Sequence, residues 1–229
     1  MRALFVTTSS DHLASGHQTG LWVEEFAVPY MAAVAAGIQI VVASPKGGAV
    51  PVDPKSTPKG SEQDEWAPAL NALRGSATLA SVENQEFDAI FIPGGHGPMV
   101  DLAHDEVLHR LVARHDGGGK LIAAVCHGPA ALVYAQRADG SPFFEGRRAT
   151  GFTDTEERLA GLHDQVPFLL EDVMKSKGAD FHSALLPMLS HVEHDGNLLT
   201  GQNPRSSEAI AKAMVGALKR IAVDSASHA

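Results

Sequence analysis

The feature that most constrains the fold of this chain is a regular alternation of short apolar runs with amphipathic stretches. The runs are rich in Val and Ile, and a cluster of turn-forming residues follows each of them. They span residues 3–6, 38–43, 89–92 and 121–125. The stretches between them place apolar residues at helical spacing, as at 21–35, 62–73 and 105–114. This order predicts an α/β fold with a doubly wound, mostly parallel, flavodoxin-like sheet and helices on both faces.

The C-terminal part of the chain adds an antiparallel hairpin at the edge of this sheet. The tripeptide Asp-Gly-Asn at 195–197 separates two short runs, and Asp and Gly tolerate the positive φ of a tight turn. Asn203 followed by Pro204 predicts the N-cap and first residue of the last helix, which we expect to end near Ile221. Residues 45–60 are rich in Pro and Gly and predict a long surface loop.

Length and composition limit the classes of function. The 229 residues, 44% of them hydrophobic, fit one globular domain, which we expect over 1–223 with a frayed tail at 224–229. A formal net charge of -9 would repel nucleic acid. The apolar run within residues 1–8 is too short for a signal sequence or a membrane span. The single cysteine, Cys126, cannot form an internal disulfide, so we expect a reducing compartment, the cytoplasm.

The residues around Cys126 have the pattern of a nucleophile elbow. An apolar run ends just before it, and the small residues Ala124 and Gly128 allow a sharp turn that directs one side chain outward. We expect an exposed sulfur and a following helix whose N-terminal end favours the thiolate. A lone cysteine in an apolar strand is otherwise a buried, inert hydrophobe, but the adjacent His127-Gly128-Pro129 favours a reactive site.

Several segments of the chain share motifs with a known family. They are Ala-Val-Cys-His-Gly-Pro at 124–129, the strand and glycine turn at 90–97, the helix motif at 19–29, and the segments 151–154 and 199–204. On these motifs the chain resembles the ThiJ/PfpI family of the class I glutamine-amidotransferase-like superfamily. The long loop at 45–60 and the segment 143–177 resemble the larger chaperone and glutathione-independent glyoxalase branch. The resemblance implies a cysteine enzyme of the stress response that needs no cofactor.

Backbone amides near the sulfur are candidates for an oxyanion hole. The turn 94–97 follows a strand at the same sheet edge as Cys126, so we expect the N–H groups of Gly95 and His127 to stabilise an oxyanion. The alternative is a plain glycine turn. Around these groups we expect a substrate pocket, which we assign to Gly94, His96, Gly128, His17 and Trp22.

Glu24 and Glu25 lie in an apolar helical stretch, and one of them is expected to point inward. They differ by roughly 100° around a helix, so both cannot face one sulfur, and the apolar pattern does not say which one does. In the family the functional glutamate stands four residues before a proline, which implies Glu25, before Pro29. We expect its carboxyl group to be protonated and to move protons at the sulfur.

The family also implies an acidic residue that orients His127. We choose Asp154, although Glu156 and Glu157 lie within one helical turn of it. A solvated helix N-terminus explains all three acids almost as well. Twelve histidines invite a metal hypothesis, but His182, His191 and His194 lack the spacing of a catalytic zinc helix, so we expect no metal.

Three functions remain open at this point. The resemblance implies a glyoxalase that converts methylglyoxal, a small carbonyl substrate, to D-lactate through a covalent adduct on Cys126. The same nucleophile would serve a cysteine amidase or peptidase. A redox-sensing chaperone would use Cys126 as an oxidation site, with turnover incidental. The family habit further implies a homodimer.

Overall fold

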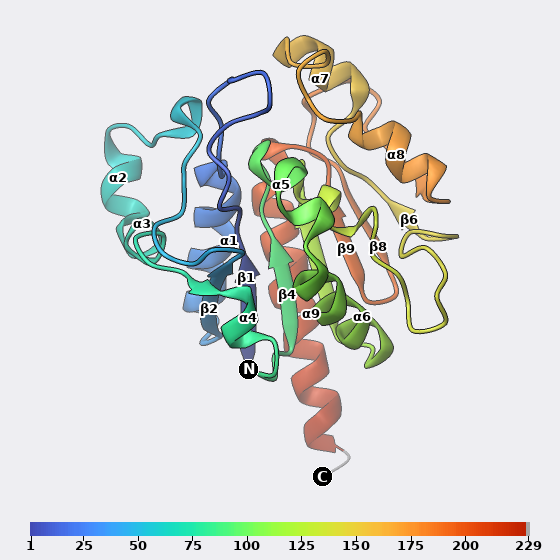
Figure 1. Ribbon diagram of the computed structural model, residues 1–229. Helices are drawn as coiled ribbons and strands as arrows, with labels where there is room; N and C mark the ends of the chain where they lie inside the picture. The colour runs from blue at the N-terminus through green and yellow to red at the C-terminus, as the bar shows by residue number, and fades with distance from the viewer. Residues whose placement is uncertain (228–229) are drawn as a thin grey trace.

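A seven-stranded sheet lies at the centre of the protein, whose computed structural model describes residues 1–227 (Figure 1). The strand order is β3-β2-β1-β4-β5-β9-β8. The strands are β1 Arg2–Val6, β2 Gln39–Ser44, β3 Ala77–Thr78, β4 Ala89–Ile92, β5 Leu121–Val125, β8 Val192–Asp195 and β9 Leu198–Gly201. All neighbours pair in parallel except β8 and β9. The expected mostly parallel sheet with an antiparallel edge hairpin is confirmed.

Helices cover both faces of this sheet. On one face α1 (Val23–Ala35) packs against α9 (Ser207–Ser227), and on the other α6 (Glu106–Gly117) packs against β4 and β5 (Figure 1). Because both faces are covered, β1, β4 and β5 are almost wholly buried, which explains why they form continuous apolar runs rather than alternating ones.

Shorter elements complete the chain. The helices are α2 Ser61–Glu65, α3 Ala67–Ala72, α4 Leu79–Val82, α5 Gly97–Val100, α7 Asp154–Ala160 and α8 Leu170–Ser176. The 3₁₀ turns are η1 Pro54–Ser56, η2 Leu102–His104, η3 Gly128–Leu132 and η4 Pro204–Ser206. A separate two-stranded sheet joins β6 Arg148–Ala149 to β7 Asp180–Phe181.

Two predicted helices differ from the observed ones. The stretch 62–73 is interrupted at Trp66, which ends α2 and caps α3, and Pro68 then stands in the first turn of α3, where its missing N–H is tolerated. The last helix begins as the 3₁₀ turn η4, capped by Asn203, and α9 continues to Ser227 rather than ending near Ile221. Of the expected frayed tail, residues 224–227 are therefore helical and 228–229 lie outside the described residues.

The carboxyl ends of β1, β4 and β5 meet at one edge of the sheet, and α7 lies beyond that edge (Figure 1). Ligands of such sheets bind at this edge. Within the described residues, none of the helices combines the length and apolar character needed to span a bilayer.

Candidate active site

Cys126 occupies a strained turn between β5 and η3. Its φ is +59°, in the left-handed region that non-glycine residues rarely adopt. Its N–H donates to the Gly201 carbonyl at 2.8 Å, and its carbonyl accepts from the Phe152 N–H at 2.9 Å. Gly128 fits tightly, because a Cβ there would lie 2.2 Å from the Ile92 oxygen. Such strain costs ~1–3 kcal/mol and persists only where the surroundings fix it. The chain therefore makes the sharp turn that its sequence predicts.

The sulfur is neither exposed nor held as a thiolate in the way we expected. Cys126 is only 4% exposed, and the helix that follows it is a 3₁₀ turn of 5 residues, too short for a strong dipole. Burial, together with the neighbouring Glu25 carboxyl group, raises the pKa of the Cys126 thiol well above its usual range. The thiol must therefore lose its proton to a neighbouring group before it can attack a substrate.

Glu25 is the carboxyl group beside this sulfur. It is fully buried in α1, and its Oε2 accepts the Gly94 N–H at 2.9 Å, while Oε1 has no hydrogen-bond partner. Burial raises the pKa of Glu25 well above its usual range, against the opposing effects of Cys126 and the Gly94 N–H. Burial therefore favours the neutral, protonated form of Glu25. Glu24, by contrast, is partly exposed.

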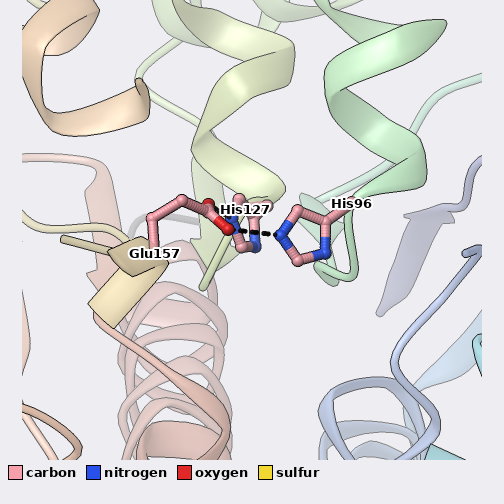
Figure 2. Close-up of side chains that lie close together, drawn as sticks. All are labelled: His96, His127 and Glu157. Carbon is pink, nitrogen blue, oxygen red and sulfur yellow. Dashed lines mark hydrogen bonds and ion pairs between the residues drawn. The ribbon is translucent and has the colours of Figure 1, made fainter. Parts of the chain in front are cut away.

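His127, His96 and Glu157 form a second buried group at the same site (Figure 2). The Nε2 of His127 lies 2.7 Å from Glu157 Oε2, and the Nε2 of His96 lies 2.8 Å from Glu157 Oε1. The two imidazole rings lie 4.0 Å apart, centroid to centroid. On its other side, His127 places its Nδ1 3.3 Å from the Cys126 sulfur. A single carboxylate thus holds both histidines.

The pKa shifts of Glu157 and His127 indicate which nitrogen atoms of this group carry protons. Burial opposes ionisation of Glu157, but the charge of His127 and hydrogen bonds from both histidines hold its pKa well below the usual range. A carboxylate only accepts, so both Nε2 atoms carry protons. Burial, and next the charge of His96, lower the pKa of His127 to about 4. His127 is therefore neutral, and its unprotonated Nδ1 accepts the thiol proton of Cys126.

Asp154 does not orient His127, and this corrects the expected assignment. It is the first residue of α7, and Glu157, one turn further along that helix, is the acid that contacts the imidazole. Burial, and next the charges of Asp172 and Glu171, raise the pKa of Asp154 to about 6. Sequence spacing could not separate these acids, because each stands within one turn of the others.

Glu156 has a different role from its neighbour Glu157. Its Oε1 accepts hydrogen bonds from the Met188 N–H, Gln202 Nε2 and Asn203 Nδ2 at 2.7–2.9 Å. Its Oε2 accepts the N–H and hydroxyl of Thr153 at 3.0 Å, as part of a capping box for α7. Glu156 therefore fixes α7 to the chain around Met188 and to the turn after β9.

The turn after β4 places backbone amides at the sulfur. Gly94 approaches the site so closely that a Cβ there would lie 2.8 Å from the His127 nitrogen and 2.6 Å from Glu25 Oε2. Gly95 has a φ of +88°, and a Cβ there would lie 2.2 Å from the Gly20 oxygen. The Gly94 N–H is already bound to Glu25, and the His127 N–H faces the Cys126 sulfur. The Gly95 and His127 amides remain the candidates for an oxyanion hole.

A cavity of about 330 Å³ opens in front of Cys126. Trp22 and His96 line it as expected, and Gly95 of the expected oxyanion hole does so too, whereas Gly94, Gly128 and His17 are not among the lining residues. Most of the wall is apolar, and no motif in the sequence marks its residues. The further lining residues are Asp53, Lys55, Phe152, Glu156, Leu159, Ala160, Leu162, Met188 and Pro204. Two of these residues, Asp53 and Lys55, lie in the loop 45–60, which its Pro and Gly content predicted.

The histidines divide into two kinds. The ligand atoms of His96, His127 and Glu157 lie within 4.8 Å of one another, close enough to hold a metal ion. Both Nε2 atoms are nevertheless engaged with Glu157, so a metal would have to replace the contacts that orient His127. His182 and His191 pair separately with Asp180 and Glu193, and His194 with the Gly196 carbonyl.

Comparison with known proteins identifies a family and several relatives that this chain resembles. A sequence profile described as the DJ-1/PfpI family matches residues 19–217. The glutathione-independent glyoxalase hsp3101 of Schizosaccharomyces pombe is 29% identical over 215 residues, which cover 87% of this chain and 88% of the relative. The human glutamine amidotransferase-like class 1 domain-containing protein 1 is 34% identical, with coverage of 85% and 87%. Among solved structures, the 24 kDa Rapid Encystment Protein of Francisella tularensis superposes with a TM-score of 0.87 at 35% identity, with coverage of 95% and 98%.

Proposed function

This chain belongs to the DJ-1/PfpI family, and from that premise we propose that it is a cysteine-dependent, glutathione-independent glyoxalase that forms D-lactate from methylglyoxal. One observation carries the proposal: the Cys126 sulfur neighbours two proton carriers of different kinds. These are the neutral acid Glu25 and the neutral base His127, which Glu157 orients. The similarity to glyoxalases over most of the chain supports the same assignment.

The first half of the reaction joins the substrate to the enzyme. His127 Nδ1 takes the thiol proton, and the sulfur attacks the aldehyde carbon C1, so that an S–C bond forms and the C=O π bond opens. Glu25 protonates the resulting oxyanion and becomes a carboxylate. The amides of Gly95 and His127 stabilise that oxygen while it carries charge. The product of this half is a hemithioacetal on Cys126.

The second half moves hydrogen between neighbouring carbons. The Glu25 carboxylate takes the C1 proton, imidazolium His127 protonates the C2 oxygen, and an enediol forms. Return of the proton from Glu25 to C2, with loss of the C1 hydroxyl proton back to Glu25, gives a lactoyl thioester. C1 is oxidised and C2 is reduced, so no external oxidant is needed. Water then cleaves the thioester to lactate and the free thiol.

A cysteine hydrolase is the second candidate, because the Cys126–His127–Glu157 chain has the order of a triad. A hydrolase, however, uses one acid–base chain, and a second, buried and neutral carboxyl group beside the sulfur has no role in it. Glu25 is therefore the residue that favours the glyoxalase. Because one relative is named as glutamine amidotransferase-like, the test below also measures hydrolase activity.

Enzymatic detection of D-lactate from methylglyoxal without glutathione tests the proposal. Wild type should form it, and Cys126→Ala should form none. Glu25→Gln should lose ~10²–10⁴-fold in rate, while Glu24→Gln, the matched control, keeps the wild-type rate. Cleavage of small amides without lactate would establish the hydrolase instead. Absence of both activities, with suppression of aggregation of a client protein that survives Cys126→Ala, would favour the chaperone.

We further propose a cytoplasmic homodimer. A single free cysteine fits that compartment, and four exposed leucines, Leu159, Leu185, Leu186 and Leu189, supply apolar surface. Light scattering at micromolar concentration should return twice the chain mass. A monomer mass would disprove the dimer.

A further inference from the structure

His96 has an unused nitrogen that faces the cavity. Its Nε2 is bound to Glu157, so in the neutral ring Nδ1 carries a lone pair. Among the described residues Nδ1 has no hydrogen-bond partner, and it is not fully buried. His96 is 8% exposed and lines the cavity, so Nδ1 is accessible from the cavity side.

His127 is less able to reach a water molecule. It is 1% exposed, and its ring packs against His96 and Phe152, at centroid distances of 4.0 and 4.5 Å. Its Nδ1 faces the sulfur and its Nε2 faces Glu157. Glu157 therefore orients two bases by the same kind of contact, one toward the nucleophile and one toward the space where substrate and water enter.

We propose that His96 is the base that activates the water which hydrolyses the acyl group on Cys126. In this step a water O–H bond breaks, its proton goes to His96 Nδ1, and the oxygen attacks the thioester carbon. The C–S bond then breaks, the thiolate takes the proton of the newly formed carboxyl group, and His96 releases its proton to solvent through the cavity. Lactate leaves as the anion. The proposal rests on the proposed function for the identity of the acyl group.

A matched pair of variants tests the role of His96. His96→Gln keeps an N–H donor where Nε2 contacts Glu157 but has no basic nitrogen, so a merely structural role would survive it. His182→Gln changes a histidine that pairs with Asp180 far from Cys126 in the chain, and it should behave as wild type. Intact-protein mass spectrometry after a short exposure to methylglyoxal and rapid desalting records any covalent adduct on each protein.

His96→Gln should accumulate one lactoyl group per chain, and its steady-state rate should fall on the order of 10²-fold or more. Neutral hydroxylamine, a nucleophile that needs no base, should release the adduct as lactohydroxamic acid and restore turnover. That rescue also shows that the variant is folded, because the adduct forms only in an assembled site. A hemithioacetal would not react in this way and would be lost on desalting.

Two results would overturn the proposal while wild type still forms lactate. One is turnover of His96→Gln at the wild-type rate, and the other is a slow variant whose thiol stays free, because His96 would then act before acylation. If wild type itself forms neither lactate nor a hydroxylamine-sensitive adduct, the glyoxalase assignment fails, and the role of His96 fails with it.

Discussion

The two sides of the active site are built by different means. On the elbow side, residues 92–97 and 124–128 position the sulfur through backbone that packs against backbone at glycines. On the α7 side, Glu156 and Glu157 position the wall and the histidines through side-chain hydrogen bonds to distant segments. We therefore expect the elbow side to tolerate no added atom. We expect the α7 side to tolerate added atoms but not the replacement of a hydrogen-bond acceptor by a donor.

The largest difference in stability should appear between two variants that each add one methyl group, one on the elbow side and one on the α7 side. Gly128→Ala would put a Cβ 2.2 Å from the Ile92 oxygen, and this backbone oxygen cannot easily move. We expect a loss of at least about 3 kcal/mol in stability and of all activity. Gly161→Ala at the end of α7 meets nothing within 4 Å and carries only its positive φ, which costs ~1 kcal/mol. Urea unfolding of both variants measures the difference.

Equal losses for the two glycines would show that the elbow can relax, and the contrast between the two sides would then be wrong.

The next effect separates the two adjacent acids of α7. Glu157→Gln removes the charge that orients His127, so the lactate-forming rate should fall ~10²–10⁴-fold. Its stability should change less than that of Glu156→Gln, because a histidine can move its proton to Nδ1 and accept from the new amide at Nε2. Glu156→Gln turns an amide NH₂ toward groups that are themselves donors, which should cost ~1–3 kcal/mol of stability. Its rate should fall far less. Steady-state kinetics and urea unfolding on the same preparations record both quantities.

If Glu156→Gln were instead inactive but stable, Glu156 and not Glu157 would be the acid that orients the histidines when substrate is bound.

A smaller effect concerns the ionisation of the sulfur, because the elbow holds Cys126 in place without making it a thiolate. Its raised pKa means that the rate of alkylation by iodoacetamide should still be rising with pH above about 9, the pKa of an ordinary thiol. Burial is the main cause and Glu25 the next, so Glu25→Gln should shift the rise to lower pH. A rate that levels off below neutral pH would instead support stabilisation of the thiolate by η3.

The contrast between the two sides also explains what the sequence could predict. The sheet and the position of Cys126 follow from local patterns, namely apolar runs, helical spacing and small residues around one turn. Glu25 needed the spacing to Pro29, because an apolar helix does not say which of two adjacent acids points inward. The choice of Asp154 over Glu157 failed because it depends on which residue of α7 contacts the turns after β4 and β5, and no local pattern encodes that contact.

The cavity wall shows the same limit. Lys55 and Met188 reach the cavity from segments far apart in the chain, and Met188 does so with a φ of +61°. No spacing rule joins such positions. The partner of His96 could not be foreseen either, because Glu157 is 61 residues away.

The smallest effect should come from Asp154, the acid that does not touch the histidines. Asp154→Asn should leave lactate formation unchanged. Its pKa of about 6 in the folded protein lies above the 3.8 of an ordinary carboxyl group, so ionisation disfavours the folded state. Wild type should therefore lose a little stability as pH rises from about 4 to about 6 and no more above that, and the variant should not. The stability of the variant relative to wild type should thus increase over this window and then stay constant, which urea midpoints across the range would record. A fall in the catalytic rate on the scale expected for Glu157→Gln would instead restore Asp154 as the orienting acid and would place the side-chain network of the α7 side one turn earlier in the helix.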